Sequence, residues 1–294
     1  MRGSGTERDG TPPTAPPTEN RRRAAAALHA DRSARGRDAD ARIVHVGRVL
    51  ATRAARSTNS PGAHGRARSL GEVERAVIAC TRCPRLRAHC ERVARERRRA
   101  FKDQTYWGRP VPGYGDPRAR LLIVGLAPAA HGGNRTGRIF TGDSSGNWLY
   151  GALHRYGFSN QPDSTGRGDG LRLDGCYVTA AGHCAPPANK PTPRELDNCQ
   201  PFLEAEIALL RGVRVVLVLG RVGWERWLRA AGWWEKMSPR ERPPFGHGRE
   251  TILPDGTVLM SSYHPSRQNT HTGRLTRTMW YSVFRRARSL VDGA

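Results

Sequence analysis

The sequence predicts an α/β fold, a three-layer αβα sandwich around a four-stranded parallel sheet. Four short apolar runs support this prediction, because each has the length and composition of a buried strand. Stretches with helical periodicity separate the runs, and this alternation is typical of parallel strands joined by crossover helices. The predicted strands cover residues 121–124, 176–179, 213–219 and 258–260.

Helices are predicted between and around these strands. The clearest start signal is at Thr192, which is followed by Pro193 and Glu195. These residues supply the cap, the first-turn proline and the third-position glutamate of a capping box, so a helix begins there. The other predicted helices cover residues 69–79, 84–101, 145–156 and 275–290, and one more follows Gly220.

Two loops rich in glycine, histidine and asparagine directly follow two of the predicted strands. One loop covers residues 125–143 and the other covers residues 264–273. The carboxyl ends of parallel strands meet at one edge of a sheet, where ligand sites of α/β proteins lie. We therefore expect both loops to contribute to one cleft. Neither loop has the glycine pattern of a dinucleotide site or a P-loop.

The first part of the chain differs in composition from the rest. Residues 1–68 are rich in arginine, proline and alanine and show almost no periodic apolar pattern, so we predict a disordered tail. Residues 69–294 are predicted to form one domain. The formal net charge is +23, and residues 71–294 carry +15 of it. A basic domain favours a polyanionic partner, above all nucleic acid, although arginine-rich codon usage is an alternative explanation.

No stretch approaches the 18 apolar residues of a membrane span, and no apolar segment follows the charged start as in a secretory signal. We expect a soluble, cytoplasmic protein that is monomeric and makes no membrane contact. An arginine-rich start also resembles a mitochondrial transit peptide, but Glu7, Asp9 and Glu19 argue against that assignment.

Six cysteines lie at positions 80, 83, 90, 176, 184 and 199. Cys80 and Cys83 form a C-x2-C pair whose spacing lets two thiolates reach one metal centre, and Cys184 and Cys199 form a second, wider pair. Four thiolates suit either zinc or a [4Fe–4S] cluster, and the spacing does not choose between them. The two remaining cysteines are predicted to be spare, and Cys176 falls in a predicted strand, where a free thiol is an ordinary core residue.

Four motifs together carry a resemblance to a known enzyme family. They are Gly-Leu-Ala-Pro-Ala at 125–129, Asn-Arg-Thr-Gly-Arg-Ile-Phe-Thr-Gly-Asp at 134–143, Cys-Ala-Pro-Pro-Ala-Asn-Lys-Pro-Thr-Pro at 184–193, and His-Pro-Ser at 264–266. Residues 78–290 resemble family 5 (type b) of the uracil-DNA glycosylase superfamily. The resemblance implies the uracil-DNA glycosylase-like fold and base excision repair of double-stranded DNA containing damaged bases, by a protein associated with the nucleoid.

The resemblance also assigns the cysteines and points to a catalytic carboxylate. It places the family's [4Fe–4S] cluster on Cys80, Cys83, Cys184 and Cys199. Relatives in the superfamily carry a polar residue just after the first glycine of the first motif, where this chain has Leu126 and Ala127. These two side chains cannot orient water, so the role must move elsewhere. Asp143 is the nearest candidate.

Breaking an N-glycosidic bond produces a positively charged sugar and an anionic base. We therefore expect Asp143 to orient water and stabilise the sugar, and His264 to donate a hydrogen bond to the departing base. Phe140 is expected to stack on the flipped base, and Asn189 offers both a donor and an acceptor to a base edge. The remaining base-binding candidates, Gly125 and Ala127, would allow backbone amides to approach the base.

The second loop, residues 264–273, is expected to contact the DNA duplex. Its polar residues, predicted to fill the gap left by the extruded nucleotide, are Ser266, Arg267, Gln268 and Asn269. Arg135 and Arg138 are further candidates for phosphate contacts. Because neither loop holds a lysine that could form a Schiff base, we expect base removal without strand cleavage. The resemblance extends the expected substrates to hypoxanthine and other deaminated bases. The alternative function is a nucleic-acid-binding module whose fold is held together by a metal site and which has no catalytic activity.

Overall fold

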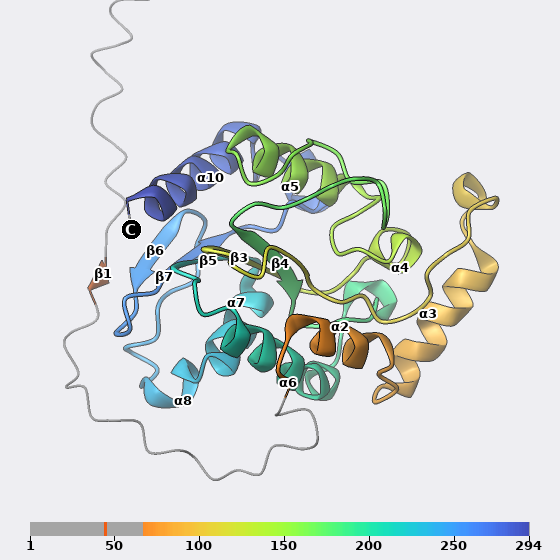
Figure 1. Ribbon diagram of the computed structural model, residues 1–294, viewed down its shortest axis with the longest axis horizontal. Helices are drawn as coiled ribbons and strands as arrows, with labels where there is room; N and C mark the ends of the chain where they lie inside the picture. Colours follow the sequence, from red (N-terminus) through yellow and green to blue (C-terminus); the bar gives the residue numbers. More distant parts are fainter. Residues whose placement is uncertain (1–43, 46–66, 294) are drawn as a thin grey trace, which may run out of the picture. The chain divides into compact units, whose positions relative to one another are not determined.

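The computed structural model describes residues 44–45 and 67–293. The tail that the sequence predicts to be disordered lies outside these residues, apart from residues 44–45 and 67–68. Within the described part, the helices and strands form one α/β domain (Figure 1).

One mixed sheet of seven strands, in the order β1-β6-β7-β5-β3-β4-β2, forms the centre of the domain. Its four central strands are parallel: β7 (Val258–Ser262), β5 (Val215–Leu219), β3 (Leu121–Gly125) and β4 (Cys176–Ala180). These are the four strands that the sequence predicts. The neighbouring strands β6 (Arg249–Ile252) and β2 (Tyr114–Gly115) are antiparallel, and β1 (Val44–His45) pairs with β6.

The expectation of a purely parallel, four-stranded sheet is therefore wrong in extent, although the fold class is confirmed. The additional strands were missed because their sequences carry weak signals. β6 reads Arg-Glu-Thr-Ile, in which polar residues interrupt the apolar pattern, and β2 is only two residues long. Since β-propensity depends on the packing partner, such segments are recognisable only once the neighbouring strand is known.

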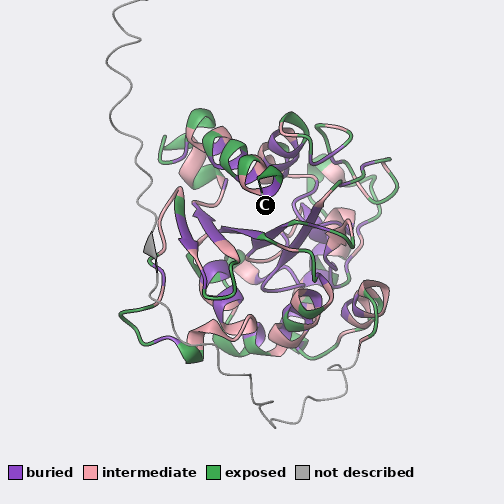
Figure 2. Ribbon diagram, turned by 60° about the vertical axis from the view of Figure 1, so that its left-hand side comes forward, coloured by how far each residue is buried: buried purple, intermediate pink, exposed green. Residues whose placement is uncertain are grey.

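Helices cover both faces of the sheet, which gives the predicted three layers (Figure 2). α5 (Ser144–Arg155) and α10 (Arg277–Asp292) pack on one face, where Trp280 and Phe284 are fully buried. α6 (Pro193–Leu209) and α7 (Arg221–Ala230) pack on the other face. β3, β4 and β5 are buried along their whole length because both faces are covered.

The remaining helices lie around this sandwich. α2 (Leu70–Ile78) packs against α6 through Val73, Val77 and Phe202. The short elements are α4 (Gly133–Thr136), α8 (Trp233–Lys236), α9 (Arg267–His271), η1 (Arg99–Phe101) and η2 (Pro187–Asn189), and α3 covers Pro84–Glu96. Among the described helices, none is long and apolar enough to cross a membrane.

Local sequence signals set the ends of several helices. The capping box predicted at Thr192 is present, with Thr192 accepting from the Glu195 N–H and Glu195 accepting from the Thr192 N–H. The helix predicted over residues 84–101 ends at Glu96, because Arg97 adopts φ 51°, which a continuing helix does not allow. The short element η1 follows it.

Candidate active site

The loops after β3 and β7 meet at the carboxyl edge of the sheet, where only β5 separates the two strands. The Ser145 hydroxyl, at the start of α5, donates to the Pro265 carbonyl oxygen at 3.1 Å. The rings of Phe140 and His264 stack with 5.7 Å between centroids and 26° between planes. The two motif loops therefore share one site.

Phe140 adopts an unusual backbone conformation that places its ring in this site. Its φ is 54°, in the left-handed region that non-glycine residues rarely adopt. Gly125 makes room for the ring, because a Cβ at Gly125 would lie 2.7 Å from Phe140 Cζ. The Tyr150 hydroxyl fixes the same loop by donating to the Ile139 carbonyl oxygen at 2.7 Å. Backbone strain of this kind clusters at functional sites.

The backbone of His264 is fixed and its ring nitrogens are unused. Asn269 Nδ2 donates to the His264 carbonyl oxygen at 2.8 Å. Neither ring nitrogen of His264 has a hydrogen-bond partner within residues 67–293. Burial lowers the pKa of His264 to about 4, so the imidazole is neutral at pH 7. A neutral imidazole can donate one hydrogen bond to a ligand.

Asp143 caps α5 and keeps a second carboxylate oxygen for other contacts. Oδ1 accepts from the Gly146 N–H at 3.0 Å. Oδ2 lies against Gly132, where an added Cβ would overlap it. Burial raises the pKa of the Asp143 carboxyl above its ordinary value, although backbone hydrogen bonds and the charges of Arg135 and Arg267 act in the opposite direction.

The other predicted base-binding residues lie at the same edge with different surroundings. Asn189 is exposed in η2 with φ 56°, and no contact joins its side chain to Asp143 or His264 among the described residues. Ala127 is half-buried opposite Gly182. Gly125 is buried, and the group that approaches it is the Phe140 ring rather than open space.

The polar residues of the second loop separate into two groups. Ser266 precedes the short helix α9, and Arg267 and Gln268 are exposed at its start. Asn269 instead turns inward, because its side chain bonds the His264 carbonyl oxygen. Three of the four residues are thus available to a ligand, and the fourth fixes the loop.

Arg138, a candidate for phosphate contacts, is buried and paired. Its Nη1 donates to both carboxylate oxygens of Asp169 at 2.7 Å and to the Ser164 hydroxyl at 2.9 Å. The guanidinium also lies over the Tyr114 ring, 5.0 Å from its centroid. Arg138 therefore anchors the loop from behind. Arg135 is half-buried and bonds the backbone of the same loop.

Five of the six cysteines gather between α3 and α6. Cys83, Cys90 and Cys184 share one buried cluster. Burial and the nearby thiols of Cys83 and Cys80 raise the pKa of the Cys199 thiol to about 12. No three His, Cys, Asp or Glu side chains within the described ranges are arranged to hold a single metal ion. Cys176 lies apart in β4, in the core position that the sequence predicts.

Comparisons with known proteins identify the family of this chain. The model of the uracil DNA glycosylase superfamily matches residues 112–287. The chain is 53% identical over 215 residues to a type-5 uracil-DNA glycosylase of Thermus thermophilus, covering 73% of this chain and 95% of the relative. The type-5 enzyme of Mycobacterium tuberculosis is 51% identical over 228 residues, which are 77% of this chain and 84% of the relative. The corresponding protein of Pyrobaculum aerophilum is 44% identical over 211 residues, 72% of this chain and 88% of that relative. The chain therefore belongs to the uracil-DNA glycosylase superfamily, in its type-5 branch.

Proposed function

We propose that this protein excises uracil from DNA by hydrolysing the N-glycosidic bond, as the first step of base excision repair. The observation that carries the proposal is the neutral His264, without a partner for its ring nitrogens, stacked on Phe140 in the loop that ends at Asp143. The three relatives described above are named type-5 uracil-DNA glycosylases, which supports an enzyme rather than a non-catalytic binding module.

His264 acts on the departing base. As the glycosidic bond breaks, negative charge develops on the uracil ring. A neutral imidazole already carries one N–H, so it can donate a hydrogen bond to a base oxygen without first gaining a proton. Its partner-free nitrogens mean that no protein hydrogen bond must be broken before the base enters.

Asp143 acts on the sugar and on water. Because Oδ1 is held by the Gly146 N–H, Oδ2 is the oxygen that orients the attacking water. The negative charge also stabilises the oxocarbenium-like sugar. Phe140 supplies an apolar face for the base, and its stacking on His264 means that the base must enter beside the ring pair or separate it.

Exposed Arg267 and Gln268, together with half-buried Ser266, fit a role on the duplex. We propose that Ser266, Arg267 and Gln268 enter the gap left by the extruded nucleotide, while Asn269 holds the loop through the His264 carbonyl. We also propose that Asn189, exposed in η2, contacts a base edge. Base removal without strand cleavage follows from the absence of lysine in both motif loops.

The gathered cysteines support a [4Fe–4S] cluster on Cys80, Cys83, Cys184 and Cys199. Four cysteine thiolates are the ligand set of such a cluster, and the Cys199 thiol is near enough to Cys83 and Cys80 for their charges to act on it. When bound, it would supply structural cross-linking and no step of the hydrolysis. Asn198 Nδ2, 3.4 Å from Cys83 Sγ, offers a hydrogen bond to one ligand sulfur.

The test uses the purified full chain and duplexes that contain one deoxyuridine. We expect alkali-dependent strand breakage with wild type, and loss of about 10²–10³ in single-turnover rate for Asp143→Asn. Duplexes containing hypoxanthine measure how broad the substrate range is. Breakage without alkali would contradict hydrolysis alone. Undiminished excision by Asp143→Asn would contradict the assigned site.

A further inference from the structure

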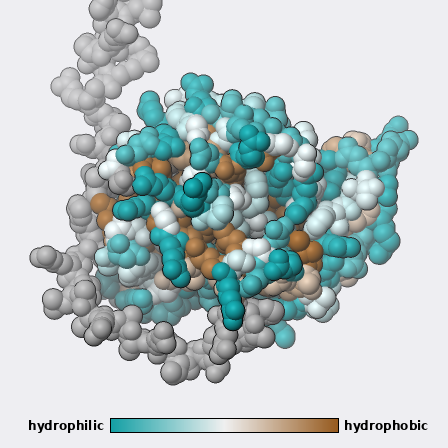
Figure 3. Space-filling model, in the orientation of Figure 1, coloured by the Kyte–Doolittle hydropathy of each residue, from teal (hydrophilic) through white to brown (hydrophobic). Residues whose placement is uncertain are grey.

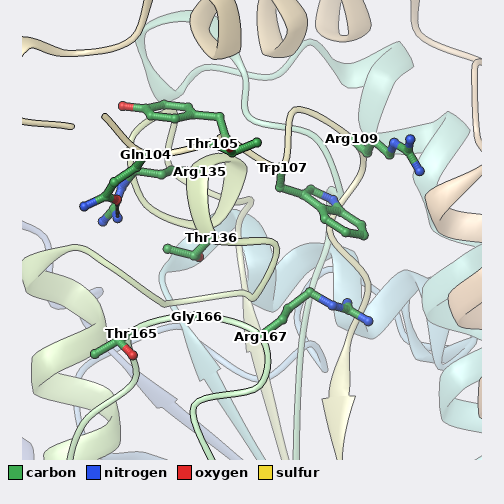
Figure 4. A pocket seen from close by; sticks show the side chains of 10 residues that line it. Gln104, Thr105, Trp107, Arg109, Arg135, Thr136, Thr165, Gly166 and Arg167 are labelled. Carbon is green, nitrogen blue, oxygen red and sulfur yellow. Dashed lines mark hydrogen bonds between the residues drawn. The ribbon is translucent and has the colours of Figure 1, made fainter. Parts of the chain in front are cut away.

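A cationic cavity of about 600 Å³ lies beside the proposed active site (Figure 4). Its walls come from residues 104–109, from α4 and from residues 165–167. Three arginines, Arg109, Arg135 and Arg167, line it, and none of its ten lining residues is acidic. A volume of this size accommodates a nucleotide-sized group.

Trp107 lies between two of these arginines (Figure 4). The Arg167 guanidinium carbon is 5.0 Å from the Trp107 ring centroid, and that of Arg109 is 5.9 Å away. Arg167 also pairs with the partly exposed Glu74 at 2.8 Å. Among the residues that the structure describes, no hydrogen bond or ion pair engages Arg109. Its charge is therefore free to meet an anion.

The third arginine connects the cavity to the active-site loop. Arg135 Nη2 donates to the Gly142 carbonyl oxygen at 2.9 Å, directly before Asp143. Gly142 has φ +81°, and a Cβ there would overlap the Arg135 guanidinium. One loop therefore forms a wall of the cavity and also presents the catalytic carboxylate.

The chain next to the cavity is strongly basic. Residues 97–99 are three consecutive arginines, all exposed, and Figure 3 shows a hydrophilic surface over this end of α3 and η1. The Arg98 backbone N–H donates to the Tyr106 hydroxyl at 3.3 Å, which ties this segment to the lining of the cavity. A strand of nucleic acid in the cavity would thus meet further positive charge in the segment next to it.

We propose that this cavity binds a phosphodiester of the substrate strand, next to the nucleotide that is excised, with the adjoining sugar or base packed on Trp107. The guanidinium of Arg109, which has no other hydrogen-bond or ion-pair partner among the described residues, contacts the phosphate. Arg167 adds positive charge beside Trp107, and Arg135 fixes the position of the strand relative to Asp143. Guanidiniums favour phosphate oxygens because their N–H groups match them in pairs, and tryptophan stacks on any base. The inference depends on the proposed function, because it takes DNA as the substrate.

The test replaces single phosphates of a deoxyuridine duplex with neutral methylphosphonates, one position at a time. We expect one or two positions near the deoxyuridine at which neutralisation raises KM by about tenfold for wild type, as for a lost charge-assisted contact. The same substitutions should have no further effect on the double variant Arg109→Ala/Arg167→Ala, whose KM is already raised. Arg211→Ala is the matched control, because Arg211 is exposed before the amino end of β5.

Arg109→Gln alone provides a second variant that breaks no hydrogen bond or ion pair within the described residues, so misfolding does not explain its effect. Equal KM profiles for wild type and the double variant would overturn the proposal. The affinity for a duplex containing 2′-fluoro-deoxyuridine, which resists hydrolysis, tests the phosphate site separately from the proposed uracil excision. If wild type excises no uracil but the double variant still binds this duplex about tenfold more weakly, the proposed function fails and the phosphate site stands.

Discussion

Gly132→Ala tests whether the position of Asp143 controls catalysis. Gly132 is buried, and an added Cβ would overlap Asp143 Oδ2. The carboxylate must therefore move by about 1 Å, and displacements of this size can reduce a rate about 100-fold. If Oδ1 also leaves the Gly146 N–H, the lost cap costs about 1 kcal/mol of the free energy of unfolding.

The assay is single-turnover excision from a deoxyuridine duplex, combined with thermal unfolding. Gly151→Ala is the matched control, because Gly151 lies on the same helix α5 with nothing within 4 Å of its added Cβ. This control should keep its rate and gain about 0.5–1 kcal/mol in stability, the usual benefit of alanine over glycine in a helix. A Gly132→Ala enzyme with a rate within twofold of wild type would refute the reasoning.

Three further predictions concern individual groups. Burial raises the pKa of Asp143 and lowers that of His264 to about 4, so kcat/KM should fall on the acid side as both groups are protonated, and the acid limb of the Asp143→Asn pH–rate profile should be one ionisation less steep. His264→Ala should slow single-turnover excision about 10²–10³-fold while binding the 2′-fluoro duplex within a few-fold of wild type; an equal loss in affinity would contradict its role as a donor in the transition state. Cys199→Ala should lose bound iron and visible absorbance, whereas Cys176→Ala should retain both, and iron retained by Cys199→Ala would contradict the ligand assignment.

Local signals in the sequence predicted the elements that depend on local interactions. The four central strands were recognisable because burial on both faces requires continuous apolar runs. The capping box at Thr192 was recognisable because its three residues interact within one helical turn. Strand β6 was not recognisable from local signals. Its buried Glu250 is neutralised by Arg286 of α10, 2.9 Å away, which is distant in the sequence.

The candidate active site likewise has features that local sequence predicts and features that depend on distant residues. Sequence motifs predicted that two loops meet, because strand ends and loop composition are local features. They did not predict that Asn269 turns inward or that Gly132 packs on Asp143. Both contacts depend on the path of a loop held by distant partners. The cavity around Trp107 was missed for the same reason, since its walls come from three separate segments.

The two kinds of arginine near the active site should respond differently to ionic strength. Arg138 and Asp169 are both about 9% exposed, so dissolved salt hardly screens their pairing. Arg109 and the arginines at 97–99 are exposed, and their attraction to a polyanion weakens steeply as salt rises. Concentrated salt should therefore release the protein from DNA while its catalytic loop keeps its shape. The enzyme can dissociate from one duplex and bind the next while its active-site loop keeps its conformation.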